Sequence, residues 1–273
     1  MLQNELVLAV ALWVLPGPCD PPVRLRAPVL REPVLDIGFT APNHLLVLGG
    51  RSITSFERRG TRLERKASLD LPLPLRPIRS SAGILAMSED GRSAWALTNQ
   101  TPRAVLLGTE TLDVYETAQV IPWPGAPGGL HYRSGTNQLV GDIPGLGEGP
   151  FLAVSTATTL AGRTLLALDA TGQLLSQRHA AESETLELAG PLALVGPATL
   201  LASDATMPAG SFANDALIAV DISEVPRIIS RCTVPGFIRA IATFRSLAPG
   251  VTDVVVVSEF DGTLRWSLMS VTE

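Results

Sequence analysis

The sequence predicts an all-β fold, and three observations lead to this prediction. Runs of roughly five to nine residues rich in Val, Ile, Leu and Thr recur between turns of Gly, Pro, Asn and Asp. No amphipathic pattern longer than about two helical turns interrupts them. The chain is 46% hydrophobic and 17% charged, with 24 Gly and 22 Pro, which is typical of a well-buried chain with many turns.

The strand-like runs group into units of about 40–50 residues with four strands each, which is the signature of the blades of a β-propeller. We therefore predict a single β-propeller domain over residues 1–273 with about five blades, six or seven being the alternatives. Residues 34–273 would form the blades. Residues 1–33 would supply the strand or strands that close the ring.

The first two units are the most regular. The first predicts strands near Val34–Thr40, His44–Gly49, Ser52–Arg58 and Arg62–Leu71. The second, residues 83–123, contains Glu-Asp-Gly at 89–91. This triplet predicts a tight hairpin, because Gly91 can adopt a positive φ.

The third and fourth units are interrupted. The third begins near Gly128 and resumes at Arg163, and the fourth begins near Gly190 and resumes at Asn214. Their interruptions, 145–162 and 207–213, both fall between the second and third predicted strands. Because successive units are neighbours in a ring, we expect these loops to lie side by side on one face.

The fifth unit begins at Phe237 and stops after three strands. An unpaired third strand would leave an exposed sheet edge, which folded proteins avoid. We expect an N-terminal segment, either residues 5–16 ("ELVLAVALWVLP") or residues 22–30 ("PVRLRAPVL"), to supply the missing strand and fasten the ring.

Two segments resemble known propeller repeats. Residues 216–244 resemble the LVIVD repeat, and the matching positions are Val220, Asp221, Ile222, Ser223, Pro226, Pro235 and Gly236. Residues 85–114 resemble the YVTN repeat, through the Asp-Gly hairpin at 90–91 and the strand that ends in Thr98-Asn99. Both resemblances imply a β-propeller. Neither implies one activity, because propellers host both enzymes and binding scaffolds.

Four polar side chains follow the second strand of their units. They are Asn99, Asp142, Asp204 and Glu259, with Gly49 at the equivalent place in the first unit. In a propeller these positions surround one mouth of the channel, where four oxygen donors could hold Ca²⁺. The other interpretation is that they are ordinary turn residues that bond nearby backbone amides.

An enzyme of the lactonase or lyase kind is the alternative function. Of the three histidines, His131 is placed on an inner strand where it could act as a general base, with Asp142 or Glu259 across the channel and a divalent metal. A structural histidine is the simpler interpretation. The chain contains no GxSxG, HExxH or GxxxxGK[ST] motif.

The two interruptions carry the main functional hypothesis, a non-catalytic scaffold that binds a protein partner. They contain Phe151, Leu152, Met207 and Phe212 with almost no charge, which is typical of a contact surface. The alternative is that residues 151–157 form an extra strand of their own blade. On the main hypothesis no cofactor is expected.

Charge and the N-terminus limit the remaining classes. A net charge of −5 with scattered Lys and Arg argues against a nucleic-acid partner. The apolar run Leu6–Leu15 is too short to span a membrane, which takes about 20 residues. It lacks a basic flank and a cleavage pattern, so we expect a cytoplasmic protein. A secreted or envelope-anchored protein is the alternative if residues 1–19 are a signal.

The two cysteines, Cys19 and Cys232, match no metal-binding motif.

Overall fold

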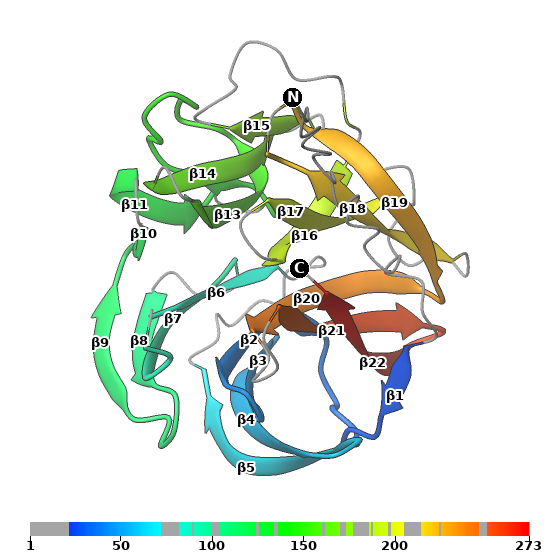
Figure 1. Cartoon of the computed structure of the whole chain (residues 1–273). Helices are drawn as coiled ribbons and strands as arrows, with labels where there is room; N and C mark the ends of the chain where they lie inside the picture. Colours follow the sequence, from blue (N-terminus) through cyan, green and yellow to red (C-terminus); the bar gives the residue numbers. More distant parts are fainter. Residues whose placement is uncertain are drawn as a thin grey trace, which may run out of the picture.

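The structure, a computed structural model, describes residues 22–71, 82–88, 90–99, 104–123, 126–133, 136–159, 162–169, 173–176, 186, 188–195, 198–204, 214–223, 225–245 and 250–272. Within these ranges all regular secondary structure is β-strand. The strands form five sheets, which we number as blades 1 to 5 in chain order. Figure 1 shows the sheets arranged around a common centre. The described part of the chain holds no helix long and apolar enough to cross a bilayer. The predicted all-β propeller of five blades is confirmed.

Blades 1 and 2 each contain four antiparallel strands in chain order. Blade 1 consists of β2 (Val34–Ala41), β3 (His44–Gly49), β4 (Ser52–Arg59) and β5 (Arg62–Asp70). Blade 2 consists of β6 (Gly83–Met87), β7 (Ser93–Thr98), β8 (Ala104–Gly108) and β9 (Val114–Ala118). The predicted strands of the first unit match these bounds to within about one residue, because tight turns separate them.

Blade 3 is a sheet of six strands, which differs from the predicted four. They are β10 (Ile121–Trp123), β11 (Ala126–Tyr132), β12 (Leu139–Val140), β13 (Phe151–Thr159), β14 (Gly162–Asp169) and β15 (Leu174–Ser176). Half of the predicted loop 145–162 is strand β13, which pairs with β14 along its length and with β12 at Phe151. The alternative of an extra strand is therefore the correct one. Its β-branched and apolar residues favour a strand over a loop.

Blade 4 has four strands, and blade 5 is completed by the N-terminal part of the chain. Blade 4 consists of β16 (Leu188–Val195), β17 (Thr199–Asp204), β18 (Asp215–Asp221) and β19 (Arg227–Val234). Blade 5 consists of β20 (Phe237–Arg245), β21 (Val251–Phe260), β22 (Thr263–Thr272) and β1 (Val23–Leu25).

Strand β1 closes the ring by pairing antiparallel with β22, with Leu25 opposite Trp266. The predicted closure by residues 22–30 is confirmed, and Figure 1 shows β1 at the outer edge of blade 5. The other predicted segment, residues 5–16, lies outside the described residues. We call the pairing of β1 with β22 the clasp.

Among the described residues, five hydrophobic clusters hold the ring together, one between each pair of neighbouring blades. They join blade 1 to 2, 2 to 3, 3 to 4, 4 to 5 and 5 to 1. Because the series returns to blade 1, the ring is closed by buried apolar contacts as well as by the clasp.

The alternation of side chains along each strand explains how one strand contributes to two hydrophobic clusters. In β21, Val254 and Val256 pack toward blade 4, whereas Val255 and Val257 pack toward blade 1. Successive side chains of a strand point to opposite faces of the sheet. A strand with neighbours on both faces therefore carries an uninterrupted apolar run instead of an alternating one.

Cys232 lies on β19 and is 6% exposed, which agrees with a small buried residue on a strand. It is not a free thiol, because its sulfur is disulfide-bonded.

The predicted Asp-Gly hairpin of blade 2 also positions that blade against blade 1. Gly91 has φ +68°, and a Cβ there would clash with the carbonyl oxygen of Thr40 on β2. Gly60 has φ +60° with open space around it.

We expect Gly60→Ala to cost about 1 kcal/mol of unfolding free energy from backbone strain alone, and Gly91→Ala roughly 2 kcal/mol or more. Chemical denaturation of both variants measures the difference, and equal costs would contradict the tight packing of this hairpin.

Candidate functional site

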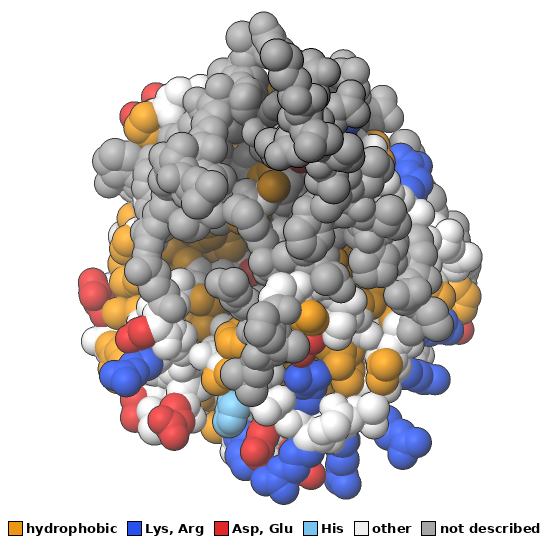
Figure 2. Space-filling view, viewed as in Figure 1, with side chains coloured by type: hydrophobic (Ala, Val, Ile, Leu, Met, Phe, Trp, Pro, Cys, Tyr) orange, Lys and Arg blue, Asp and Glu red, His pale blue; other side chains and the backbone are white. Residues whose placement is uncertain are grey.

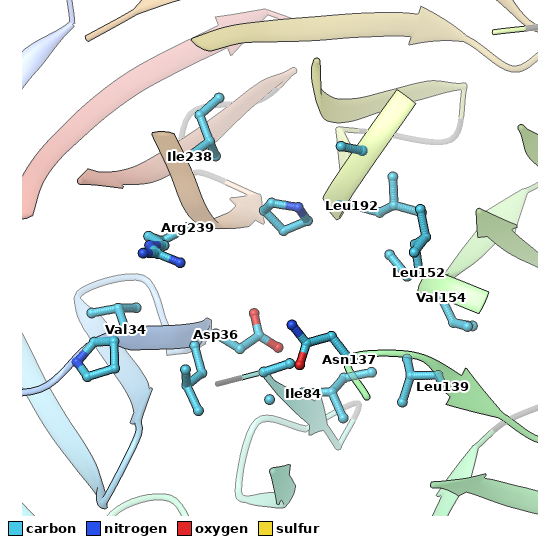
Figure 3. Close-up of a pocket in the computed structure, with 18 of the residues that line it drawn as sticks. Val34, Asp36, Ile84, Asn137, Leu139, Leu152, Val154, Leu192, Ile238 and Arg239 are labelled. Atoms are coloured by element: carbon cyan, nitrogen blue, oxygen red, sulfur yellow. The ribbon is translucent and has the colours of Figure 1, made fainter. Parts of the chain in front are cut away.

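The innermost strands of the ring enclose a cavity of about 720 Å³. Every blade contributes to its wall, through β2, β6, β11, β12, β13, β16, β20 and β21. Figure 3 shows side chains of these strands converging around one open space. Much of the wall is apolar, and this part includes Val34, Ile84, Leu139, Val154, Leu192 and Ile238. A largely apolar cavity of about 300–1,000 Å³ with a few polar groups is typical of a binding site.

Asp36 on β2 is the main polar group of the cavity, and its carboxyl group points into the open space toward Asn137 (Figure 3). Its Oδ2 accepts a hydrogen bond from the backbone N–H of Leu85 on β6 at 2.7 Å, and its Oδ1 accepts one from Ile37 at 2.8 Å. Burial raises the pKa of Asp36 to about 7, although the two N–H donors oppose the rise. Asp36 therefore changes charge near neutral pH.

Tyr132 and Asn137 of blade 3 supply neutral polar groups to the same wall. Asn137 is held by blade 2, because its Oδ1 accepts a hydrogen bond from Nδ2 of Asn99 at 2.6 Å. Burial, and secondly the charge of Asp36, raises the pKa of Tyr132. Tyr132 therefore keeps its hydroxyl proton at neutral pH and lies close enough to Asp36 to sense its charge.

Arg239 and Glu259 form an ion pair in the part of the wall contributed by blade 5. Nε and Nη2 of Arg239 both lie 2.8 Å from Oε2 of Glu259. The guanidinium group also lies over the ring of Phe237, 5.0 Å from its centroid. Because these two charges neutralise each other, Asp36 is the only acid without a cationic partner among the described residues of the wall.

The four predicted oxygen donors do stand at or near strand ends, but their side chains do not converge. Asn99 bonds to Asn137, Asp204 pairs with Arg231 at 2.9 Å, and Asp142 is exposed after β12. Of the four, Glu259 alone lines the cavity. The described residues contain no group of three or more His, Cys, Asp or Glu that could hold a metal ion. Gly49 ends β3, as expected.

The histidines are not in the cavity wall so far as the structure describes it. His131 lies on β11 but is exposed, and its neighbour Tyr132 lines the cavity instead. One residue of shift along a strand turns a side chain to the other face, which is the reason for the difference. His44 is exposed at the start of β3, and His179 lies outside the described residues.

The four predicted contact residues differ in their location in the structure. Phe151 is 1% exposed and packs in the core between blades 2 and 3. Leu152, the next residue of β13, is 38% exposed and lines the cavity. Met207 and Phe212, with the whole segment 207–213, lie outside the described residues. In Figure 2, hydrophobic side chains are visible at depth near the middle of the face that Figure 1 presents.

Four polar residues of the wall were not selected by sequence reasoning: Asp36, Tyr132, Asn137 and Arg239. The available signal was a single carboxylate within "VLDIGF", a strand that is otherwise apolar. A buried charge inside such a strand is costly and marks a functional candidate.

Comparisons with known proteins return no family model and no curated protein that matches the chain. Among solved structures, the chain is similar to the WD40 β-propeller domain of Doa1, with 8% identity, coverage of 90% of this chain and 95% of that chain, and a TM-score of 0.47. It is also similar to Hsv2 of Kluyveromyces lactis, with 11% identity, coverage of 82% and 72%, and a TM-score of 0.42. Both TM-scores are below 0.5, so the five-bladed fold follows from the sheets and core clusters, and no function follows from these proteins.

Proposed function

We propose that the protein is a non-catalytic interaction module that binds a protein partner on the face around the central cavity. The observation that carries the proposal is Leu152, which is 38% exposed and lines the cavity. Pro33 and Pro191 extend the same lining. Apolar surface gathered in this way is typical of a contact region. Of the predicted segment 145–162, residues 152–154 line the cavity, whereas the predicted segment 207–213 lies outside the described residues.

The ring supports this role because it is rigid. Each blade buries apolar side chains against both neighbours, so the residues around the cavity are held in place before a partner arrives. A preorganised surface loses little conformational entropy on binding. More of the contact energy then contributes to affinity.

The proposal includes repeats of the LVIVD type in blade 4 and of the YVTN type in blade 2. The local structure around Asp221 gives a physical reason for the first pattern. Its Oδ1 accepts hydrogen bonds from the backbone N–H of Ser223 at 2.9 Å and from the Ser223 hydroxyl at 2.6 Å. At the other end of the motif, Gly236 has φ +84°, a conformation that favours glycine.

The alternative enzyme is not favoured by a specific observation. A general base of this kind would require His131 and either Asp142 or Glu259 to face one substrate. His131 and Asp142 are exposed, and Glu259 is paired with Arg239.

Site-specific photo-crosslinking tests the proposed face. A benzoylphenylalanine residue placed at Leu152 in the native host should give a crosslinked adduct with one protein. The matched control is Ile229 on β19, which is 40% exposed against 38% for Leu152. The proposal expects the adduct from position 152 and none from position 229. An adduct from neither position, or the same adducts from both, would contradict it.

A further inference from the structure

The cavity wall has an unbalanced charge once Asp36 is ionised. The other ionisable groups described in the wall are Tyr132, which stays neutral, and Arg239 with Glu259, which neutralise each other at 2.8 Å. Asp36 has two backbone N–H donors and, among the residues that the structure describes, no cationic partner. An ionised carboxylate enclosed in this way is stabilised most by a positive charge that enters the cavity.

The geometry leaves room for such a charge at Asp36. A carboxylate has about four lone-pair sites, and the backbone of Ile37 and Leu85 uses two of them. In Figure 3 the carboxyl group faces the open space and Asn137. Tyr132 and Asn137 line the same cavity, and the oxygen of a tyrosine hydroxyl or of a side-chain amide can accept hydrogen bonds.

We infer that the central cavity binds an organic cation, the ammonium group of a lysine side chain or of a small amine, which pairs with Asp36. The inference rests on the proposed function for the location of the site and adds the chemistry of its ligand. An ammonium group brings three N–H donors for the oxygens of Asp36, Tyr132 and Asn137. Its aliphatic stem would lie against the apolar wall, as lysine stems do on apolar surfaces.

Other ligand classes fit this wall less well. Ca²⁺ takes six to eight oxygen ligands, and the described residues bring no cluster of acids together here. An anion would meet the charge of Asp36 directly, and Arg239, the one cation among the described residues of the wall, is already paired with Glu259.

Binding of a cation should depend on pH with a defined sign. The cation favours the ionised form of Asp36, so it must displace the proton that this group holds below its pKa of about 7. We expect n-butylammonium to bind about tenfold more weakly at pH 6 than at pH 8, because the ionised fraction of Asp36 falls by about that factor. n-Butanol, a neutral molecule of similar shape, should show no such change.

An NMR titration of the full chain with both probes measures these affinities. Equal affinity of n-butylammonium at the two pH values, or equal affinity of the two probes, would overturn the inference. Asp36→Asn should weaken n-butylammonium at least tenfold at pH 8, whereas Glu148→Gln, at an exposed acid of blade 3, should leave it unchanged. If Asp36→Asn does not fold, the pH comparison on the unmodified protein still decides.

The source of the cation is a separate arm of the same experiment. The peptide acetyl-Gly-Lys-Gly-amide should bind more tightly than n-butylammonium if a protein side chain is the ligand, and more weakly if the ligand is a small amine. Its form with an acetylated lysine serves as the neutral control. Both orders of affinity support a cation site, and the absence of binding by both cations overturns it. Crosslinking at Leu152 without binding of either cation would retain the docking face and reject the cation.

Discussion

Replacing Leu25 with alanine is expected to lower the free energy of unfolding by about 3 kcal/mol. Leu25 is one of three residues of β1, is 3% exposed and packs in the cluster that joins blades 5 and 1. Phe56 and Trp266 of this cluster lie with ring centroids 6.4 Å apart. The shortened side chain would leave a cavity in the region where the ring closes. Urea denaturation followed by tryptophan fluorescence measures the loss.

Val23→Ala is the matched control for the clasp. Val23 lies on the same short strand and is 49% exposed, so its truncation should change the stability by less than about 0.5 kcal/mol. Both variants keep the backbone pairing of β1 with β22. If Leu25→Ala is as mild as Val23→Ala, the buried side of the clasp does not stabilise the ring.

Raising the pH from 5 to 8 is expected to reduce the contribution of Asp36 to stability by about 3 kcal/mol. Burial raises the pKa of this group from 3.8 to about 7. The folded protein therefore holds a proton that the unfolded chain releases, and stability falls as the pH rises from about 4 to about 7. Above that range both states are ionised at this group, and the effect levels off.

The difference between the unmodified protein and Asp36→Asn isolates this contribution. Other carboxyl groups titrate over the same range, but they do so in both proteins. Between pH 5 and pH 8, the unfolding free energy of the unmodified protein should fall by about 3 kcal/mol relative to that of Asp36→Asn. A difference that stays constant with pH would show that Asp36 is ionised throughout and would remove the basis for this prediction.

The strands that sequence reasoning placed well are those bounded by strong turn signals. The predicted closing segment at residues 22–30 also followed from the unpaired edge of the last three strands. The third unit was harder to divide into strands, because Phe151–Thr159 follows the glycine-rich residues 145–149, and the sequence left both a long loop and an extra strand open. Its partners β12 and β14 are set by tertiary pairing, which local propensity does not contain.

The cavity itself was harder to predict than the ring. Glu259 was assigned to the mouth of the channel and does line the cavity, but it also pairs with Arg239 on the neighbouring strand. Asp36 lies on blade 1 and Tyr132 on blade 3, so the two residues approach each other only through the packing of these blades. Which face of a strand points inward depends on a register of one residue, as His131 and Tyr132 show.

The antiparallel pairing of β1 with β22 has a consequence for the order of assembly. Among the described strands, β1 leaves the ribosome first and β22 last. Blade 5 therefore cannot be completed until β22 has been synthesised, which happens after the strands of every other blade. Contacts between such distant parts of a chain slow folding. In the nascent chain, β1 must remain unpaired until the final hairpin of β21 and β22 emerges. The ring can close only after that step.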